Sequence, residues 1–175
     1  MSKYFFNFLI ISLLVILIQG VFSALNILFP LNIFLVILVF ITIIFGFNWG
    51  FIFSIFAGFA LNLFSYLPLG SFIIIYLVVL LSVSFLYKNV FINLSLYTSL
   101  LLTFLATLIY QLLILLFNFM FYFLNLINIY ITIDRTLLIY LGKQIILNLL
   151  VMSILFILAK ATSKRLNLAF LIKNE

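Results

Sequence analysis

The sequence predicts an all-α fold, a polytopic membrane protein in which a six-helix transmembrane bundle has both termini cytoplasmic. Composition is the first reason: 70% of the residues are hydrophobic and only 6% are charged, whereas a soluble surface needs roughly a quarter charged residues. The second reason is the length of the apolar runs, because a helix crossing a ~30 Å hydrocarbon core needs about 20 residues. We therefore expect residues 1–175 to form a single integral-membrane domain.

The expected spans follow the apolar runs along the chain. We interpret the first as an uncleaved helix rather than a signal peptide, because the run is long and no A-x-A cleavage site follows it. Pro30 suits the start of the second helix, where the N–H that proline lacks would be unpaired anyway. The spans are expected at residues 4–25, 30–46, 49–64, 71–87, 94–120 and 136–159.

Two connections divide the later part of the chain. A loop break is expected at Pro68 and Gly70, because Pro68 disfavours helix at the residue before it and Gly70 tolerates backbone angles that other residues resist. Residues 126–133 alternate loosely between apolar and polar, which indicates a surface segment or loop. Asp134 then suits the N-cap of the last helix.

The basic residues predict the orientation of the bundle. Lys and Arg concentrate on the cytoplasmic side of membrane proteins. With both termini inside, only Arg135 and Lys143 fall on the outer side. The remaining basic residues are then cytoplasmic: Lys3, Lys88, Lys160, Lys164, Arg165 and Lys173.

A glycine-rich stretch, residues 46–70, is the segment around which we expect the bundle to be organised. Residues four apart lie on one face of a helix, and small residues on such a face let a second helix approach closely. This face serves either helix packing within the bundle or an interface with a partner protein. Its residues are Gly46, Gly50, Ser54, Gly58 and Asn62.

The residues available for chemistry are few. The chain has no cysteine and no histidine, and its only acids are Asp134 and Glu175. We therefore expect no catalytic, metal or cofactor site, and no enzymatic activity. No basic patch lies outside the C-terminal tail, so nucleic acid is not an expected partner. Lys143 is expected to extend to the membrane surface; pairing with Asp134 or with a ligand anion is the alternative.

Several motifs follow one another in a fixed order along residues 30–76: Pro30, Gly46, Gly50, Ala57-Gly58, Asn62-Leu63, Pro68-Leu69-Gly70 and Tyr76. This order resembles the MreD family of bacterial rod-shape-determining membrane proteins. The resemblance covers residues 30–76; family members usually carry Asp-Leu where this chain has Asn62-Leu63. It implies a non-enzymatic scaffold in the bacterial inner (cytoplasmic) membrane. Its implied partner is an MreC-like protein, and through it an MreB-like filament and wall-synthesis enzymes.

A second hypothesis comes from a different class of protein. Small six-helix proteins also serve as substrate-binding membrane subunits of energy-coupling-factor vitamin transporters. That role requires a pocket in which a few polar groups converge, and a small-residue surface for the transport partner. A lipid-modifying enzyme is the least favoured class, because the chain lacks histidine and paired acids.

The orientation can be tested with single introduced cysteines, because the chain has none of its own. Asn89→Cys and Asn167→Cys should react with a membrane-impermeant maleimide only from the cytoplasmic side, since the basic loops are held there. Thr132→Cys should react only from the outside. Labelling of Asn167→Cys in intact cells would contradict a cytoplasmic C-terminus.

Overall fold

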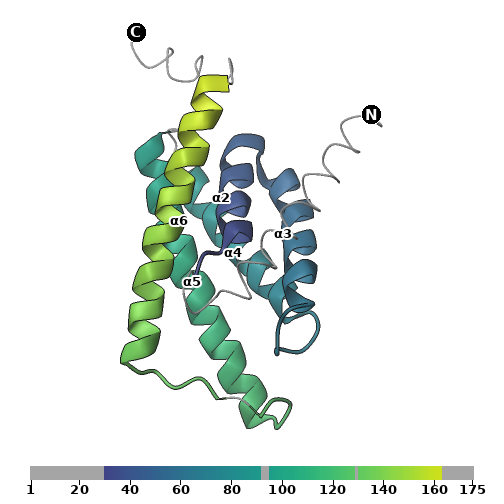
Figure 1. The fold of residues 1–175 in the computed structure, drawn as a ribbon. Coiled ribbons are helices and arrows are strands. Elements are labelled where there is room, and N and C mark those ends of the chain that lie inside the picture. The colour runs from purple at the N-terminus through teal and green to yellow at the C-terminus, as the bar shows by residue number, and fades with distance from the viewer. Residues whose placement is uncertain (1–29, 92–94, 129, 163–175) are drawn as a thin grey trace.

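The structure is a computed structural model that describes residues 30–91, 95–128 and 130–162. The regular structure of these residues is entirely helical (Figure 1). The first expected span, residues 4–25, lies outside the described residues. The helices are α2 (Ile33–Phe45), α3 (Phe47–Asn62), α4 (Ser71–Asn89), α5 (Leu96–Phe123) and α6 (Arg135–Thr162).

Three of the described helices, α4, α5 and α6, are long and apolar enough to cross a membrane. Helices α2 and α3 have 13 and 16 residues. At a rise of 1.5 Å per residue they are about 20 and 24 Å long, short of a ~30 Å core. Helix α2 is therefore shorter than the span expected at residues 30–46, whereas α3 has the length expected for residues 49–64 but begins and ends two residues earlier. The described residues belong to a lipid bilayer; the six-span count and the placement of the termini stay predictions.

The start of α2 differs from the sequence expectation for a local reason. The helix begins at Ile33 rather than at Pro30, because the side-chain oxygen of Asn32 accepts a hydrogen bond of 3.0 Å from the backbone N–H of Leu35. An asparagine in this position satisfies one of the free N–H groups of the first turn. At its other end α2 turns directly into α3 at Gly46, whose φ of +87° favours glycine.

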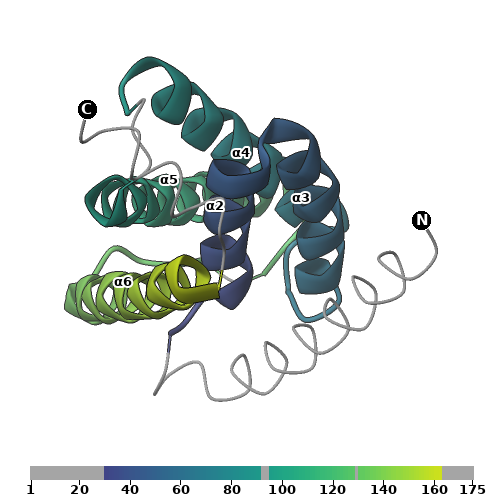
Figure 2. The ribbon, with the colours of Figure 1, turned by 90° about the horizontal axis from the view of Figure 1, so that it is seen from above.

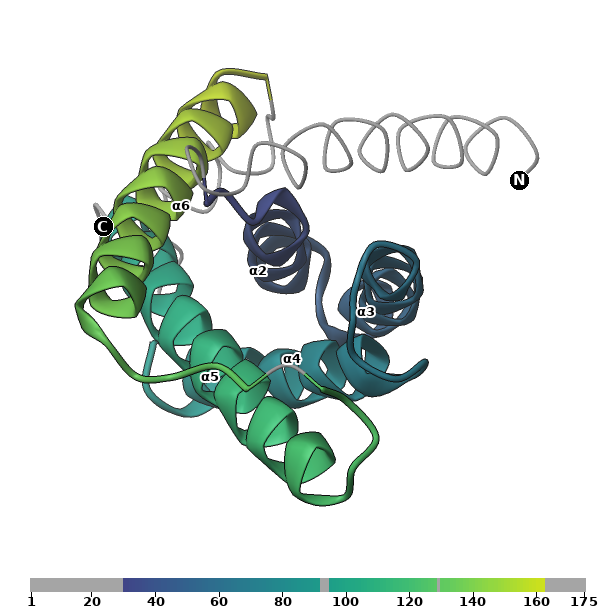
Figure 3. The same ribbon diagram turned by 60° about the horizontal axis from the view of Figure 1, so that its bottom comes forward.

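Helix α2 is the centre of the bundle. It packs against α3, α4, α5 and α6 (Figures 2 and 3). The two longest helices, α5 and α6, pack side by side, and α3 packs on α4. The glycine-rich stretch is therefore one wall of the bundle rather than its centre. The most deeply buried side chains of α2 are Phe34, Leu35, Val36, Leu38 and Val39.

Candidate functional site

The small-residue face of α3 lies against α4. A Cβ atom added at Gly58 would come within 2.5 Å of the Cα atom of Ile73, so the two helix backbones touch at this point. At Gly50, an added Cβ would lie 2.6 Å from side-chain atoms of Leu80 and Thr42. Ser54 is also buried on this face. The structure therefore places these residues inside the bundle.

Gly46 does not share this face. It precedes the first residue of α3, and a Cβ atom added to it would meet nothing within 4 Å. Its positive φ is what the turn from α2 to α3 requires. Gly46 was expected on the small-residue face because of its four-residue spacing from Gly50. It is a turn residue in the structure and makes no packing contact there.

Asn62, the last residue of α3, is buried against the first turn of α4. Its side-chain oxygen accepts a hydrogen bond of 3.3 Å from the backbone N–H of Phe72. The first N–H groups of a helix have no partner within that helix, and Gly70 at the N-cap of α4 has no side chain to supply one. The Nδ2 atom of Asn62 has no hydrogen-bond partner within the described residues.

Pro68 and Gly70 lie in the connection between α3 and α4. The Pro68 carbonyl accepts a hydrogen bond of 2.6 Å from the Ser71 hydroxyl. Gly70 has a φ of +94°, in the left-handed region that side-chain-bearing residues rarely adopt. This connection fixes the direction in which α4 leaves α3.

A buried hydrogen-bond network joins four helices at the start of α2. The side-chain oxygen of Asn32 accepts a bond of 2.8 Å from the hydroxyl of Tyr76 on α4. The backbone N–H of Asn32 donates to Asn148 Oδ1 on α6, at 3.1 Å. Asn148 Nδ2 in turn donates to Thr107 Oγ1 on α5, at 3.0 Å. In hydrocarbon each of these groups needs a protein partner, so the network fixes the relative positions of α2, α4, α5 and α6.

Tyr110 on α5 extends the network. Its hydroxyl forms a hydrogen bond with the Asn32 side chain. Its ring meets the ring of Tyr76 edge-on, with 5.8 Å between centroids and 78° between planes. Edge-to-face geometry is favourable for aromatic pairs. The two phenols thus form one side of a polar core around Asn32.

A cavity of about 340 Å³ lies beside this polar core. Its wall takes residues from four helices, α3, α4, α5 and α6, from the two residues that precede α2 and from the connections before α4 and α6. No charged side chain is among the described residues that line it. The polar lining consists of amides and hydroxyls from Asn32, Ser65, Tyr66, Tyr110, Gln111, Tyr140 and Gln144.

Gln144 is the unusual member of this lining. Its side chain is 3% exposed, and its Oε1 atom has no hydrogen-bond partner in the described part of the chain. Leaving a buried acceptor unpaired costs about 1–3 kcal/mol. Tyr66, in the connection before α4, has its pKa raised by burial, while its hydrogen bond with Asn118 acts in the opposite direction. The Tyr66 hydroxyl is therefore neutral at physiological pH.

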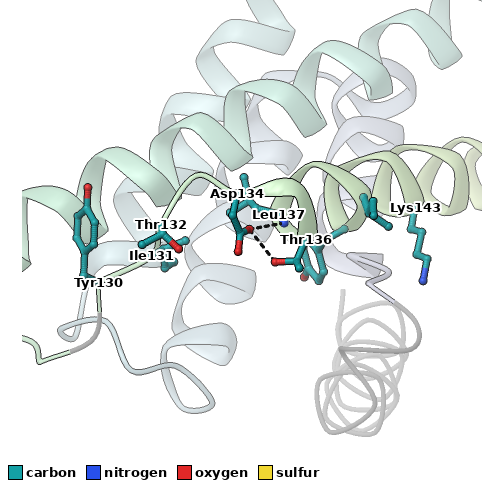
Figure 4. Close-up of a pocket in the computed structure, with 9 residues that line it drawn as sticks. Tyr130, Ile131, Thr132, Asp134, Thr136, Leu137 and Lys143 are labelled. Atoms are coloured by element: carbon teal, nitrogen blue, oxygen red, sulfur yellow. Dashed lines mark hydrogen bonds between the residues drawn. The ribbon is translucent and has the colours of Figure 1, made fainter.

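A second, surface pocket of about 470 Å³ lies at the start of α6 (Figure 4). The Asp134 carboxylate accepts hydrogen bonds from the Thr136 hydroxyl at 2.7 Å and from the Leu137 N–H at 3.0 Å. These two bonds, the hydroxyl first, lower the pKa of Asp134. The cap therefore stabilises the fold fully above the unfolded pKa of about 3.9 and is lost as pH falls through the lower folded pKa.

The N-cap role expected for Asp134 is thus confirmed. Lys143 lines the same pocket and is exposed. Figure 4 shows its ammonium end directed away from the Asp134 carboxylate. The bonds of that carboxylate go to Thr136 and Leu137 rather than to Lys143.

Most residues of the polar core were not singled out by the sequence interpretation. Tyr76 was named as a residue of the MreD resemblance, but the amides and the threonine of the core were not among the predicted site residues. They are Asn32, Thr107, Gln111, Gln144 and Asn148. The sequence does contain a pattern from which they could have been predicted, because polar residues recur every four positions along both α5 and α6. They are Ser99, Thr103, Thr107 and Gln111 on α5, and Gln144 and Asn148 on α6.

Comparison of the chain with protein-family models, with curated proteins and with solved structures found no match. The class of protein is therefore defined by the fold and the site themselves. Within its described residues this is an all-helical membrane protein whose polar core lies beside an uncharged cavity.

The two buried glycines of α3 should differ in their tolerance of alanine. Gly58→Ala should destabilise the protein by about 1–3 kcal/mol, because its Cβ would meet the backbone of Ile73. Gly50→Ala should cost less, because the atoms that its Cβ meets belong to side chains. Gly142→Ala is the control: with open space around its Cβ, it should gain up to about 1 kcal/mol of helix propensity. Thermal unfolding in detergent measures the order, and equal tolerance at all three positions would contradict the α3–α4 contact.

The polar core predicts a ranking of stability losses. Asn32→Ala should cost about 2–4 kcal/mol, because it removes the α2 cap and leaves the buried Tyr76 hydroxyl without its acceptor. Tyr76→Phe should cost about 1 kcal/mol, since the Asn32 oxygen keeps its bond from Leu35. Ser153→Ala is the matched control, because its hydroxyl bonds to the Leu149 carbonyl of its own helix. A loss no larger for Asn32→Ala than for Ser153→Ala in denaturant unfolding would disprove the central role of Asn32.

Proposed function

We propose that this protein is a non-enzymatic membrane scaffold of the bacterial cell-elongation machinery, similar to MreD. In this proposal it spans the inner (cytoplasmic) membrane six times with both termini inside. It binds a single-span MreC-like partner and, through that partner, an MreB-like filament and wall-synthesis enzymes. The sequence supports a non-catalytic role, because the chain has no histidine, no cysteine and only two acids.

The observation that carries the proposal is the position of Asn62, where the chain departs from the Asp-Leu of the MreD pattern. The Asn62 side-chain oxygen accepts the Phe72 N–H in the first turn of α4. A carboxylate at this position would accept the same hydrogen bond, and the partial positive charge of a helix N-terminus favours it. The departure from the pattern therefore preserves the hydrogen-bonding role and changes only the charge.

Other residues of the resemblance also make buried contacts. Gly58 lies against the backbone of α4, and Gly50 lies between Leu80 and Thr42. Tyr76 donates to Asn32 in the polar core. The motifs shared with MreD thus coincide with the contacts that hold α2, α3 and α4 together, which is the pattern expected if the shared feature is the fold of a scaffold.

The contacts within the bundle limit where a partner helix can bind. The glycine face of α3 is occupied by α4, so the partner must meet another surface. Helix α6 is the least buried of the three long spans, and its outer face is apolar. In this proposal the partner helix packs along exposed residues spaced four apart, namely Ile146, Leu150, Ile154 and Leu158.

Depletion of the protein from a rod-shaped host should make the cells widen or round up. Asn62→Asp should restore the rod shape, because a carboxylate can accept the Phe72 N–H. Asn62→Leu should fail, because it leaves that N–H without its partner in the bilayer. Cell width under the microscope is the measurement, with membrane abundance of each variant as the control. Normal width after complete depletion would contradict the scaffold role.

The cavity favours one second function, that of a substrate-binding subunit of an energy-coupling-factor vitamin transporter. Its volume of about 340 Å³ and its converging amides and phenols suit a small ligand. The depletion experiment separates the two functions. Loss of vitamin uptake with unchanged cell shape would replace the scaffold by the transporter subunit.

A further inference from the structure

Gln144 lines the cavity and carries a hydrogen-bond acceptor that is unpaired within the described residues. The residue is 3% exposed, yet its Oε1 atom has no hydrogen-bond partner among the described residues. Gln111, also buried, lines the same cavity from α5, and Tyr140 lines it one turn before Gln144 on α6. Hydrocarbon offers no hydrogen bonds to a buried amide. A ligand that donates a hydrogen bond would remove the energetic penalty at Gln144.

The lining also limits the charge of that ligand. Within the described residues the polar groups of the wall are side-chain amides and hydroxyls, all of them uncharged. A charged ligand would lose its hydration there without gaining an opposite charge. Amides and hydroxyls supply both donors and acceptors, which suits a ligand whose own groups do both. Hydroxyl groups have this property, and the rings of Phe64 and Phe72 add flat apolar walls.

We propose that the cavity binds an uncharged, polyhydroxylated ring of the sugar type, and that a ligand hydroxyl donates to Gln144 Oε1. A volume of about 340 Å³ lies in the range of small-molecule sites. The ring can belong to a free sugar or to the headgroup of a glycolipid, since the chemistry of both is the same. This site is separate from the outer face of α6, so it does not depend on the scaffold function.

The test uses the full chain in a polyoxyethylene detergent, because sugar-based detergents would compete for the cavity. The probes are glucosyl diacylglycerol and free methyl glucoside, with diacylglycerol and phosphatidylglycerol as comparison lipids. A glucose-bearing probe should raise Tm saturably by about 5 °C, through binding to the folded state alone. A response to the glycolipid alone identifies a headgroup site, and a response to both probes identifies a site for the sugar itself. No response to either probe, or a response no larger than that to phosphatidylglycerol, would overturn the proposal.

Gln144→Met distinguishes ligand binding from a structural role. The substitution keeps the length of the side chain and removes the unpaired acceptor, so the ligand-free protein should be at least as stable as wild type. The affinity for the glucose-bearing probe should fall at least about tenfold, since a hydrogen bond to the ligand is lost. Ile157→Met, at an exposed position of α6 that does not line the cavity, should leave the affinity unchanged. Gln111→Met is a second lining variant with the same expected loss. Full retention of affinity in both lining variants, or a destabilised ligand-free Gln144→Met, would refute the proposal.

Discussion

The hydrogen bonds of Asn32 are the constraint on which the rest of the described structure depends. A polar group in hydrocarbon cannot form hydrogen bonds with water, so its hydrogen-bond partner must lie inside the protein. Asn32 begins a short helix at the centre of the bundle and bonds to residues of α4, α5 and α6, directly or through Asn148. Its position therefore determines how α2, α4, α5 and α6 are placed relative to one another along their axes. The apolar side chains of α2 can then pack only in the register that these bonds allow.

Between α3 and α4, steric contact and hydrogen bonding determine different features of the packing. Side-chain hydrogen bonds between membrane helices are worth about 0.6 kcal/mol on average, whereas forcing a methyl group into a packed contact costs about 1–3 kcal/mol. The distance between α3 and α4 is accordingly set by Gly58 against the Ile73 backbone. The bond from Phe72 to Asn62 instead satisfies the free start of α4. Glycine thus controls how close the helices come, and the amide controls where α4 begins.

The sequence predicted the helices better than it predicted the contacts between them. The expected spans at residues 71–87, 94–120 and 136–159 agree with α4, α5 and α6 to within a few residues, because long apolar runs fix them locally. Pro30 was a misleading boundary, since the capping bond of Asn32 decides where α2 begins. The polar core was not foreseen because its bonds join residues far apart in the chain, such as Asn32 and Asn148, 116 positions apart. Spacing along one helix can show a polar face, but it cannot name the helix that the face meets.

The use of amides in place of acids follows from the same membrane constraint. An aspartate at the centre of a membrane helix costs about 2.5–3.5 kcal/mol on insertion scales, and its charge would change with pH. Among the described residues the buried interior uses amides and hydroxyls instead, as at Asn32, Asn62 and Asn148. Amides and aliphatic hydroxyls do not titrate, and tyrosine hydroxyls ordinarily ionise only near pH 10. The polar core therefore keeps its hydrogen bonds over the whole physiological pH range. Gln144 belongs to the same set, but its Oε1 atom has no hydrogen-bond partner within the described residues. Within the described residues the other unpaired buried amide atom is Asn62 Nδ2, a donor, and Asn62 does not line this cavity. The unpaired acceptor of Gln144 belongs to a residue of the cavity wall, which gives it the character of a binding group.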